Sequence, residues 1–588
     1  MEGRLASAVV AVVCIFWTVG AAGQESAPMG LVDDWSTKHI IFTNGGSPEA
    51  EARAQRDPRH LQHWLRRSAY LFRGIPARER GESEHDWFGQ EFRRPRPDRL
   101  KTDWAMSLGG TGGMPIGESP AKFTFNATGV LTFPASCTND FAVYVINANA
   151  AAGTQANIVA FNNLYTGTTS SSCPNGPQSP VTTNRTTPTF MWSYAVGSGP
   201  VVLSPVLSLD GKKVAFVEAA PAGGASFHVL TWVAGQGTNA TTGAVAPGAG
   251  GSSVTSLAYT NTTVAGCAAS SSANNDSSPY VDYANDVAYV GAGNGRLYRI
   301  KGVFQSAPVL DYCVTTVAGR ALTSPVYDPV SGKVFVSDGQ VVYAYTPGAT
   351  SFTAAGSITV AGTAGSIILS PIVDSTNGFV YVFSSHNAGN TNSIVSQMPA
   401  SLASKVDAAI GPITTGFILD GAFDNKYFAN GPAAGSLYAC GTQAGAATKP
   451  SLYTLTFAAT KIMNITPAMS DNRNITTVAN PASTCSPLLE YFDGTNDRLF
   501  VGVGTSGATT GANLVTAWNI NTRITLTTAT PTSTAINQFG GTSGFSIDNN
   551  STAFQAASIY LGTLASSATA SCGPNLFCAV KLTQSGLQ

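Results

Sequence analysis

The feature that most constrains this chain is a repeated unit of short strands and tight turns. It is clearest in residues 324–345, SPVYDPVSGKVFVSDGQVVYAY. A Ser-Pro pair opens the unit, and the segment DPVSG places Pro and Gly where turn geometry favours them. Asp338-Gly339 is a hairpin dipeptide, and apolar residues fill the stretches between the turns. The unit therefore predicts strand, turn, strand, turn, strand.

Further copies of this unit recur along the chain. Four of them begin with a Ser-Pro pair, at Ser204, Ser278, Ser370 and Ser486, and an Asp follows the first strand of each. Weaker copies without Ser-Pro start at Ala142, Ser436 and Ser558. A lone hairpin is marginal in water, so each unit must bury its face on its neighbours. A four-stranded unit repeated at roughly this spacing is typical of a propeller blade. We therefore predict an all-β fold, a β-propeller of eight four-stranded blades with a small, partly helical N-terminal segment.

Two stretches of the repeat resemble a known family. VAYVGAGNGRLYRI (residues 287–300) and VFVSDGQVVYAY (residues 334–345) resemble the blade repeat of quinoprotein dehydrogenases and of the related outer-membrane assembly propellers. The resemblance covers most of residues 119–588 and implies the propeller fold. In the enzymes of that family it also implies a quinone cofactor beside a vicinal disulfide, a stacking Trp and acidic residues that hold calcium. No two cysteines are adjacent in this chain, and Trp192, Trp232 and Trp518 lie in no recognisable docking motif, so we expect no cofactor.

Composition divides the chain into three parts. Residues 1–23 combine Arg4, an apolar run and small residues before Gln24, which predicts a secretory signal peptide, with an uncleaved membrane anchor as the alternative. Residues 24–104 form a charged, partly helical segment and linker. Its residues 27–104 carry 14 Lys+Arg and 12 Asp+Glu, whereas residues 105–588 carry only 17 and 19. Residues 105–588 are the predicted propeller.

The charged segment contains two helix signals. Asp57-Pro58 is typical of a helix start, and apolar residues at helical spacing follow it as far as a stop near Gly74. Ser47-Pro48-Glu49 indicates a shorter helix before it. The stretch DDWSTKHIIF (residues 33–42) is consistent with a short strand or an adhesive segment. The sequence does not indicate where this stretch lies in the fold.

The closure of the ring needs one more strand. The last repeat ends with LFCAVKL, its third strand, which would leave an open edge. The segment AKFTFNATG (residues 121–129) precedes the first repeat and alternates as a strand would. We predict that it pairs beside the C-terminal strand.

The cysteines predict disulfides. Without Cys14, which lies in the signal, eight of the nine remain in a secreted context. No CxxC spacing occurs among them, so a zinc site is not expected. We predict the pairs in sequence order: Cys137–Cys173, Cys267–Cys313, Cys440–Cys485 and Cys572–Cys578.

Other candidate sites have a structural alternative that we favour. His60 and His63, one helical turn apart, could share a metal ion with His39 or His85, but two histidines on an exposed helix face are more often only solvated. The repeated Asp could bind calcium, but Asp is also a standard turn residue. A hydrolase base could be His228 or His386, although the chain contains no GxSxG.

Charge limits the functions that this chain can have. Charged residues make up 11% and the formal net charge is −1, which argues against nucleic-acid binding. We predict a secreted or envelope-associated, non-catalytic binding or scaffold protein, inserted in no membrane after signal cleavage. Its partner would be neutral and polar, such as a glycan or a protein surface. The alternative is an enzyme, either a quinoprotein-like oxidoreductase or a glycan-active hydrolase or lyase.

The Ser-Pro serines are the predicted binding residues. In propellers, ligands bind where the loops that enter the innermost strands gather at one mouth of the channel. Those loops carry the repeated serines, whose hydroxyls could instead only cap turns. The predicted set is Ser204, Ser278, Ser324, Ser370 and Ser486.

Overall fold

The structure is a computed structural model of the chain. It describes residues 30–73, 100–126, 135–165, 188–219, 224–260, 263–267, 277–317, 319–413, 418–442, 450–465, 472–474, 483–492, 496–505, 514–522, 536–538, 540–548, 558–568 and 570–584. The predicted signal peptide, residues 74–99 of the predicted charged segment and linker, which include His85, and Cys173 lie outside these residues.

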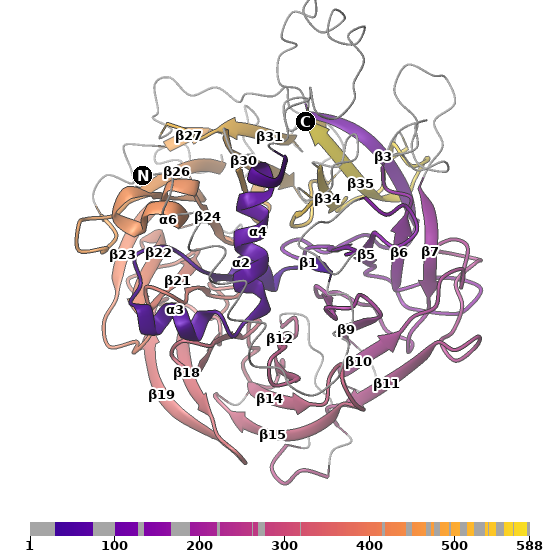
Figure 1. Ribbon diagram of the computed structural model, residues 1–588, viewed down its shortest axis with the longest axis horizontal. Coiled ribbons are helices and arrows are strands. Elements are labelled where there is room, and N and C mark those ends of the chain that lie inside the picture. The colour runs from indigo at the N-terminus through magenta and orange to yellow at the C-terminus, as the bar shows by residue number, and fades with distance from the viewer. Residues whose placement is uncertain are drawn as a thin grey trace, which may run out of the picture.

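Eight small sheets follow one another around a ring, so the predicted eight-bladed propeller is confirmed (Figure 1). Blade 1 contains β4 (Ala121–Thr124), β5 (Phe141–Val145), β6 (Ile158–Asn162) and β7 (Thr189–Tyr194). Blade 2 contains β8 (Val206–Leu207), β9 (Lys213–Glu218), β10 (Ser226–Thr231) and β11 (Ser253–Ala258). Blade 3 contains β12 (Tyr280–Asp282), β13 (Val287–Gly291), β14 (Arg296–Lys301) and β15 (Val309–Thr315). Blade 4 contains β16 (Val326–Asp328), β17 (Lys333–Ser337), β18 (Val341–Pro347) and β19 (Phe352–Thr359).

The second half of the ring repeats this plan with more variation. Blade 5 contains β20 (Ile372–Asp374), β21 (Phe379–Ser384), β22 (Asn392–Pro399) and β23 (Val406–Pro412). Blade 6 contains β24 (Gly421–Phe423), β25 (Ser436–Thr442), β26 (Pro450–Thr456) and β27 (Asn472–Asn474), with α6 (Asn425–Asn430) after β24. Blade 7 contains β28 (Ser483–Cys485), β29 (Leu489–Phe492), β30 (Asp497–Thr505), β31 (Leu514–Asn519) and β32 (Ile536–Asn537). Blade 8 contains β33 (Ser546–Asp548), β34 (Ser558–Gly562), β35 (Phe577–Gln584) and β3 (Leu100–Gly109).

The strand that closes the ring is β3, which pairs antiparallel with β35. The prediction that residues 121–129 do so is wrong, because β4 is the innermost strand of blade 1 and pairs with β5. Breaks in register at Thr102/Trp104 and Ser107/Gly109 interrupt the alternation of β3. A period-two pattern is the main sequence signal of a strand, so these bulges hide β3 from a sequence analysis. β3 also begins at Leu100, before the boundary predicted at residue 105.

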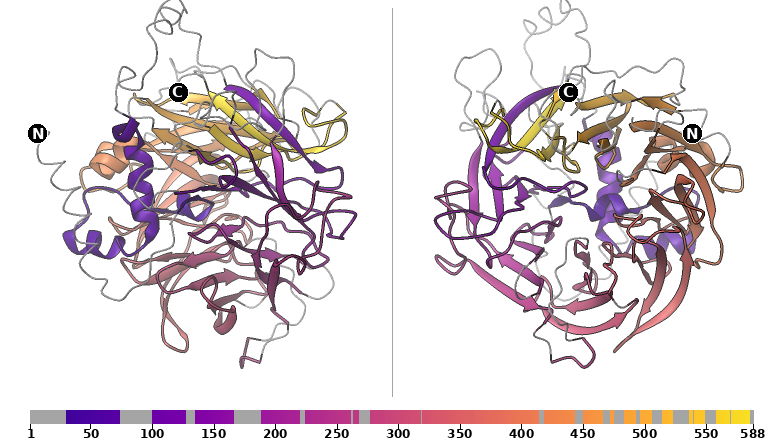
Figure 2. Two further views of the ribbon diagram at one scale, coloured as in Figure 1. Left: turned by 45° about the vertical axis from the view of Figure 1, so that its right-hand side comes forward. Right: turned by 180° about the vertical axis from the view of Figure 1, so that it is seen from behind.

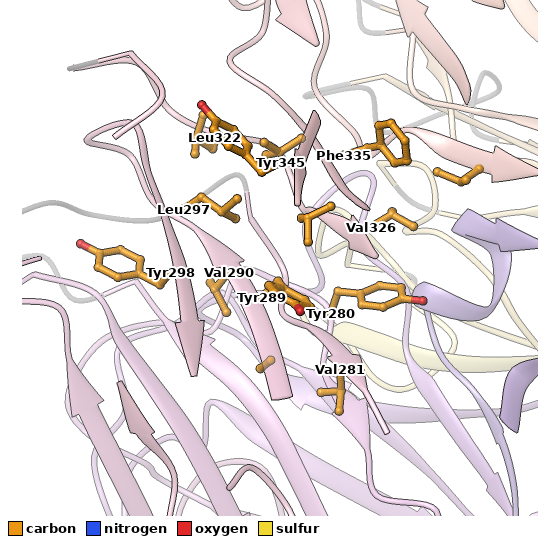
Figure 3. Close-up of a cluster of buried hydrophobic side chains, with 14 of the residues drawn as sticks. Tyr280, Val281, Tyr289, Val290, Leu297, Tyr298, Leu322, Val326, Phe335 and Tyr345 are labelled. Atoms are coloured by element: carbon orange, nitrogen blue, oxygen red, sulfur yellow. The ribbon is translucent and has the colours of Figure 1, made fainter. Parts of the chain in front are cut away.

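Apolar side chains fill the spaces between blades. The largest cluster runs through blades 2 to 5, and Figure 3 shows its part in blades 3 and 4, with Tyr289, Val290, Leu297 and Val326 all buried. The rings of Tyr289 and Tyr327 stack across this boundary with their centroids 5.6 Å apart. Because neighbouring blades cover both of its faces, a central strand such as β13 is buried at every residue.

Three disulfides confirm three of the predicted pairs: Cys267–Cys313, Cys440–Cys485 and Cys572–Cys578. The second joins β25 of blade 6 to β28 of blade 7. Cys137 is also disulfide-bonded, and its predicted partner Cys173 lies outside the described residues.

Residues 30–73 of the N-terminal segment contribute two short strands and three helices: β1 (Leu31–Asp33), α2 (Ser36–His39), β2 (Ile40–Ile41), α3 (Pro48–Ala54) and α4 (Pro58–Arg73). Both predicted helices are present, and the Ser47 hydroxyl caps α3 by accepting a hydrogen bond from the Ala50 amide. Figures 1 and 2 show α3 and α4 on one face of the ring. None of the helices in the described parts of the chain has the length and apolar character needed to cross a bilayer.

Candidate functional site at the plugged axis of the propeller

Residues 31–43, here called the axial segment, cross the middle of the ring (Figure 1). β1 pairs antiparallel with β4 of blade 1, and β2 pairs parallel with β20 of blade 5. Between them, Trp35 Nε1 donates a hydrogen bond to the Pro279 carbonyl at 3.1 Å. The stretch that the sequence could not place is therefore a plug, fixed to opposite sides of the propeller.

The helices after the plug fasten it to one face of the ring. Arg59 of α4 lies between the rings of Tyr280 and Tyr283, 4.6 Å from each centroid, and forms an ion pair with Asp57. Arg67 forms an ion pair with Glu490 of blade 7 at 2.6 Å. The face of α4 that carries these arginines is thus anchored by charged contacts.

The Ser-Pro serines hold neighbouring blades together. The Ser204 amide donates to the Ser278 hydroxyl at 2.9 Å, and the Ser278 amide donates to the Ser324 hydroxyl at 2.7 Å. The Ser370 hydroxyl donates to the Ser324 carbonyl at 2.9 Å, and the Ser486 hydroxyl donates to the Thr542 carbonyl at 2.7 Å. All five predicted serines are between 1% and 6% exposed. We call these inter-blade contacts the Ser-Pro belt. Whether any of these serines binds a ligand stays a prediction.

Two further residues belong to this belt and were not predicted from the sequence. Ser119-Pro120 is a further copy of the dipeptide, directly before β4, and the Ser119 amide donates to the Ser204 hydroxyl at 2.8 Å. Glu118 Oε2 accepts hydrogen bonds from the Ser204 hydroxyl at 2.6 Å and the Ser278 hydroxyl at 3.0 Å. The dipeptide was a readable signal for Ser119. Nothing in the sequence marks Glu118, because its role depends on two distant blades.

Buried ionisable groups meet at the axis. Ser204, Ser278, Ser324 and Ser370 line a small space together with Lys38 and Asp420. Burial raises the pKa of Asp420 to about 7, although the Leu488 amide and Lys38 act in the opposite direction. Burial lowers the pKa of His39 to about 4, against the hydrogen bond of its Nδ1 with the Pro371 carbonyl. The axis therefore holds groups whose ionisation depends on the plug staying in place.

A larger opening, the axial cavity, lies on the other side of Lys38. It has a volume of about 110 Å³ and is lined by the axial segment, by α4 and by the inner strands of blades 5 to 8. Phe423, Phe428 and Leu488 form an apolar part of its wall, and Lys38 also lines it. Pockets with an apolar wall and a few convergent polar groups are the usual form of a small-molecule site.

The histidines of α4 are not on an exposed face, so the solvated alternative for them is wrong. His60 is 7% exposed, and its Nε2 lies 2.7 Å from Glu51 Oε1. His63 packs against Phe428 and accepts a hydrogen bond from Arg67 Nε at 3.3 Å. Within the described ranges, no three His, Cys, Asp or Glu side chains are grouped so that they could hold a metal ion.

The repeated Asp residues cap turns in the blades where they are described. Asp328 Oδ1 accepts the Val330 amide and Oδ2 accepts the Ser331 amide, each at 3.0 Å. Asp282 Oδ1 accepts the Ala284 amide at 3.1 Å in the same way. These carboxylates therefore have the turn-capping contacts that their sequence positions suggested.

His228 takes part in a hydrogen-bonded chain on blade 2. Its Nε2 lies 2.9 Å from Glu218 Oε2, and its Nδ1 lies 2.8 Å from the hydroxyl of Ser256 on the outermost strand. His386 lies in a loop, with Nδ1 2.9 Å from the Ser385 hydroxyl. The first chain ties β9, β10 and β11 together through their side chains.

Comparisons with known proteins concern the architecture alone. No family model and no curated protein matches the chain. Among solved structures, BamB from Moraxella catarrhalis aligns at 10% identity with a TM-score of 0.38, over 82% of this chain and 97% of that one. Sqt1 from Saccharomyces cerevisiae aligns at 10% identity with a TM-score of 0.45, over 83% of this chain and all of that one. The propeller itself is established by the order of strands in the sheets.

Proposed function

We propose that this chain is a non-catalytic scaffold that works outside the cytoplasm and binds a partner protein by adding a strand to the edge of blade 2. Its extracytoplasmic location is supported by the predicted signal peptide and by the three disulfides between described residues, since disulfides persist in oxidising compartments. The quinoprotein resemblance supports the blade architecture, and we propose no reaction from it.

The outer edge of β11 carries this proposal. β11 is the last strand of its sheet, and its six residues, SVTSLA, contain no charge and no Pro. Ser253, Thr255 and Ser256 are exposed. An edge strand presents a row of unpaired N–H and C=O groups, which proteins usually protect with charges, Pro or bulges.

The other long outermost strands have such protection. The outermost strand pairs of blades 1, 3, 4, 5 and 8 each contain a break in register, whereas β10 and β11 pair without a break over six residues. β15 and β23 also carry an Asp, and the edge of β7 is covered by bridges to Gln236 and Val245. β11 is therefore the regular, unprotected edge in the described part of the ring.

The exposed groups on the edge of β11 indicate which class of partner would bind there. A row of backbone donors and acceptors matches an extended polypeptide, since strand addition takes its affinity from main-chain hydrogen bonds. The absence of charge on β11 favours a neutral segment and predicts binding that depends only weakly on salt. A glycan lacks the regular repeat of donors and acceptors, so we prefer a protein partner to a glycan.

The test places a photo-crosslinking amino acid at position 255 in the secreted chain and exposes it to envelope and secreted proteins. The crosslinked protein is then purified, and its binding is measured directly. We expect amide exchange to slow in residues 253–258 on binding. We also expect Thr255→Lys, which adds a charge to the edge, to weaken binding more than tenfold.

The matched control is Thr353→Lys, which adds the same charge to an exposed position of β19 and should leave binding unchanged. Equal binding by wild type and Thr255→Lys would overturn the proposal. So would strongly salt-dependent binding to anionic polymers, turnover of a glycan, or dye reduction that depends on added quinone.

A further inference from the structure

The axial cavity is lined by one cationic side chain that forms no ion pair with the described residues. Two of its three cationic side chains are paired, Arg66 with Asp33 and Arg67 with Glu490. Lys38 is the third. Its Nζ lies at the boundary with the small axial space, where its one contact is a long one of 3.5 Å to the Ser119 hydroxyl. Within the described residues it forms no ion pair with a carboxylate. The lining therefore carries an excess of one positive charge.

The position of Lys38 makes this charge unfavourable without a partner. Burial lowers the pKa of its ammonium group, although Asp33 and Asp420 act in the opposite direction. Asp420 itself has a pKa raised to about 7 by burial, so it is largely neutral in mildly acidic solution. A partly buried ammonium that lacks a close counter-ion favours an anion that can enter beside it.

The other lining residues indicate which kind of anion would fit the cavity. Phe423, Leu488 and Ile372 form an apolar wall, and the Phe428 ring lies 3.5 Å beneath the Arg67 guanidinium, which leaves that cation little room for a ligand. One water needs roughly 10–15 Å³ of such space, so about 110 Å³ has room for a molecule of roughly seven to ten non-hydrogen atoms. A phosphate would find one free cation and a mostly apolar wall. A monocarboxylate with a short apolar or aromatic part matches both features.

We propose that the axial cavity binds a small organic monocarboxylate, with its carboxylate paired to Lys38 and its apolar part against Phe423 and Leu488. The axial segment and α4 supply one side of this site, and the propeller supplies the other. Ligand binding therefore strengthens the attachment of residues 31–43 to the ring. The site is separate from the edge of β11, and it does not depend on strand addition there.

The test titrates the full secreted chain with a set of acids and their neutral amides, for example benzoate, phenylacetate and hexanoate against benzamide, phenylacetamide and hexanamide. We expect saturable binding of at least one acid by calorimetry, a rise in Tm, and at least tenfold weaker binding of the matching amide. Amide exchange in residues 31–43 should slow when that acid is bound.

Variants separate this site from adventitious binding. Lys38→Met keeps the apolar stem and should weaken binding of the acid at least tenfold, while Lys38→Arg keeps most of it. Lys301→Met, which removes a cation that is 56% exposed on blade 3, is the matched control and should bind as wild type does. If Lys38→Met fails to fold, Ala422→Leu tests the same site by filling the cavity, since Ala422 lines it.

Three results would overturn the proposal. They are the absence of saturable binding for every acid in the set, equal binding of the acids and their amides, and full binding by a folded Lys38→Met or Ala422→Leu variant. An acid that binds without changing amide exchange in residues 31–43 occupies another place and also counts against it.

Discussion

Lys581 Nζ lies 2.9 Å from Asp103 Oδ2, and this ion pair joins the third strand of blade 8 to the strand that closes the ring. Both side chains are almost fully buried, at 0% and 3% exposed. A second buried pair, Lys122 with Asp548 at 3.1 Å, joins blade 1 to blade 8 beside it. The seam between the two ends of the propeller is thus held by ion pairs, whereas apolar side chains fill the boundary between blades 3 and 4.

The first prediction follows from the seam. Lys581→Met should lower the free energy of unfolding by about 3–5 kcal/mol, because it leaves the Asp103 carboxylate buried without its partner. Replacing both residues with apolar ones should recover much of that loss. Urea denaturation of the single and double variants measures this. Lys301→Met, which breaks an exposed pair with Asp311, should cost less than about 1 kcal/mol. Equal costs for the two single variants would contradict the role of the seam.

The second prediction concerns pH and His39. Its pKa falls from 6.5 when unfolded to about 4 when buried in the plug. Between those values the unfolded chain binds the extra proton, so stability falls as the pH falls from 6.5 to 4, by roughly 3 kcal/mol in total. His39→Gln removes this pH-dependent contribution to the free energy of unfolding. The difference in unfolding free energy between wild type and variant, measured from pH 7 to pH 4, should shrink accordingly, and a constant difference would argue against it.

The third prediction concerns the Ser-Pro belt. Ser278→Ala removes one of the two acceptors of the Ser204 amide, the other being Glu118 Oε2, and it also removes a donor to Glu118. It should therefore destabilise by about 1–3 kcal/mol. Ser370→Ala removes one donor to a carbonyl and should cost only about 1 kcal/mol. Denaturant unfolding of both variants tests the order. If Ser370→Ala is the more harmful change, the belt does not work as described.

The blades could be predicted from the sequence because their signals are local. Asp338-Gly339 and the Ser-Pro pairs mark turns and strand starts within a few residues. The axial segment could not be placed from the sequence, because β1 has only three residues and β2 only two. Each is a strand only because it pairs with a strand far along the chain. Val32 pairs with Phe123 and Ile40 with Val373. The excess charge at Lys38 is likewise visible only once four blades and α4 surround it.

The fourth prediction compares two disulfides. In the chain-entropy model, the stabilisation grows with the length of the loop that is closed. The Cys440–Cys485 bond spans 45 residues and Cys572–Cys578 spans 6, which gives about 4 and about 2 kcal/mol. Replacing each pair with Ser and measuring unfolding in urea tests this. A larger loss from the shorter loop would indicate that local packing, and not chain entropy, governs these bonds.

The last prediction asks whether the plug can leave while the ring stays folded. Trp35 is 5% exposed, packs edge-on against Tyr280 and donates to the Pro279 carbonyl. Trp35→Ala should cost about 3–5 kcal/mol, since it removes a large buried ring and leaves that carbonyl without its donor. The plug is attached by two very short strands, so this loss should appear as local opening. Amide exchange should therefore accelerate in residues 31–43, while β17 in blade 4 stays protected. Equal acceleration in β17 would mean that plug and ring unfold as one unit.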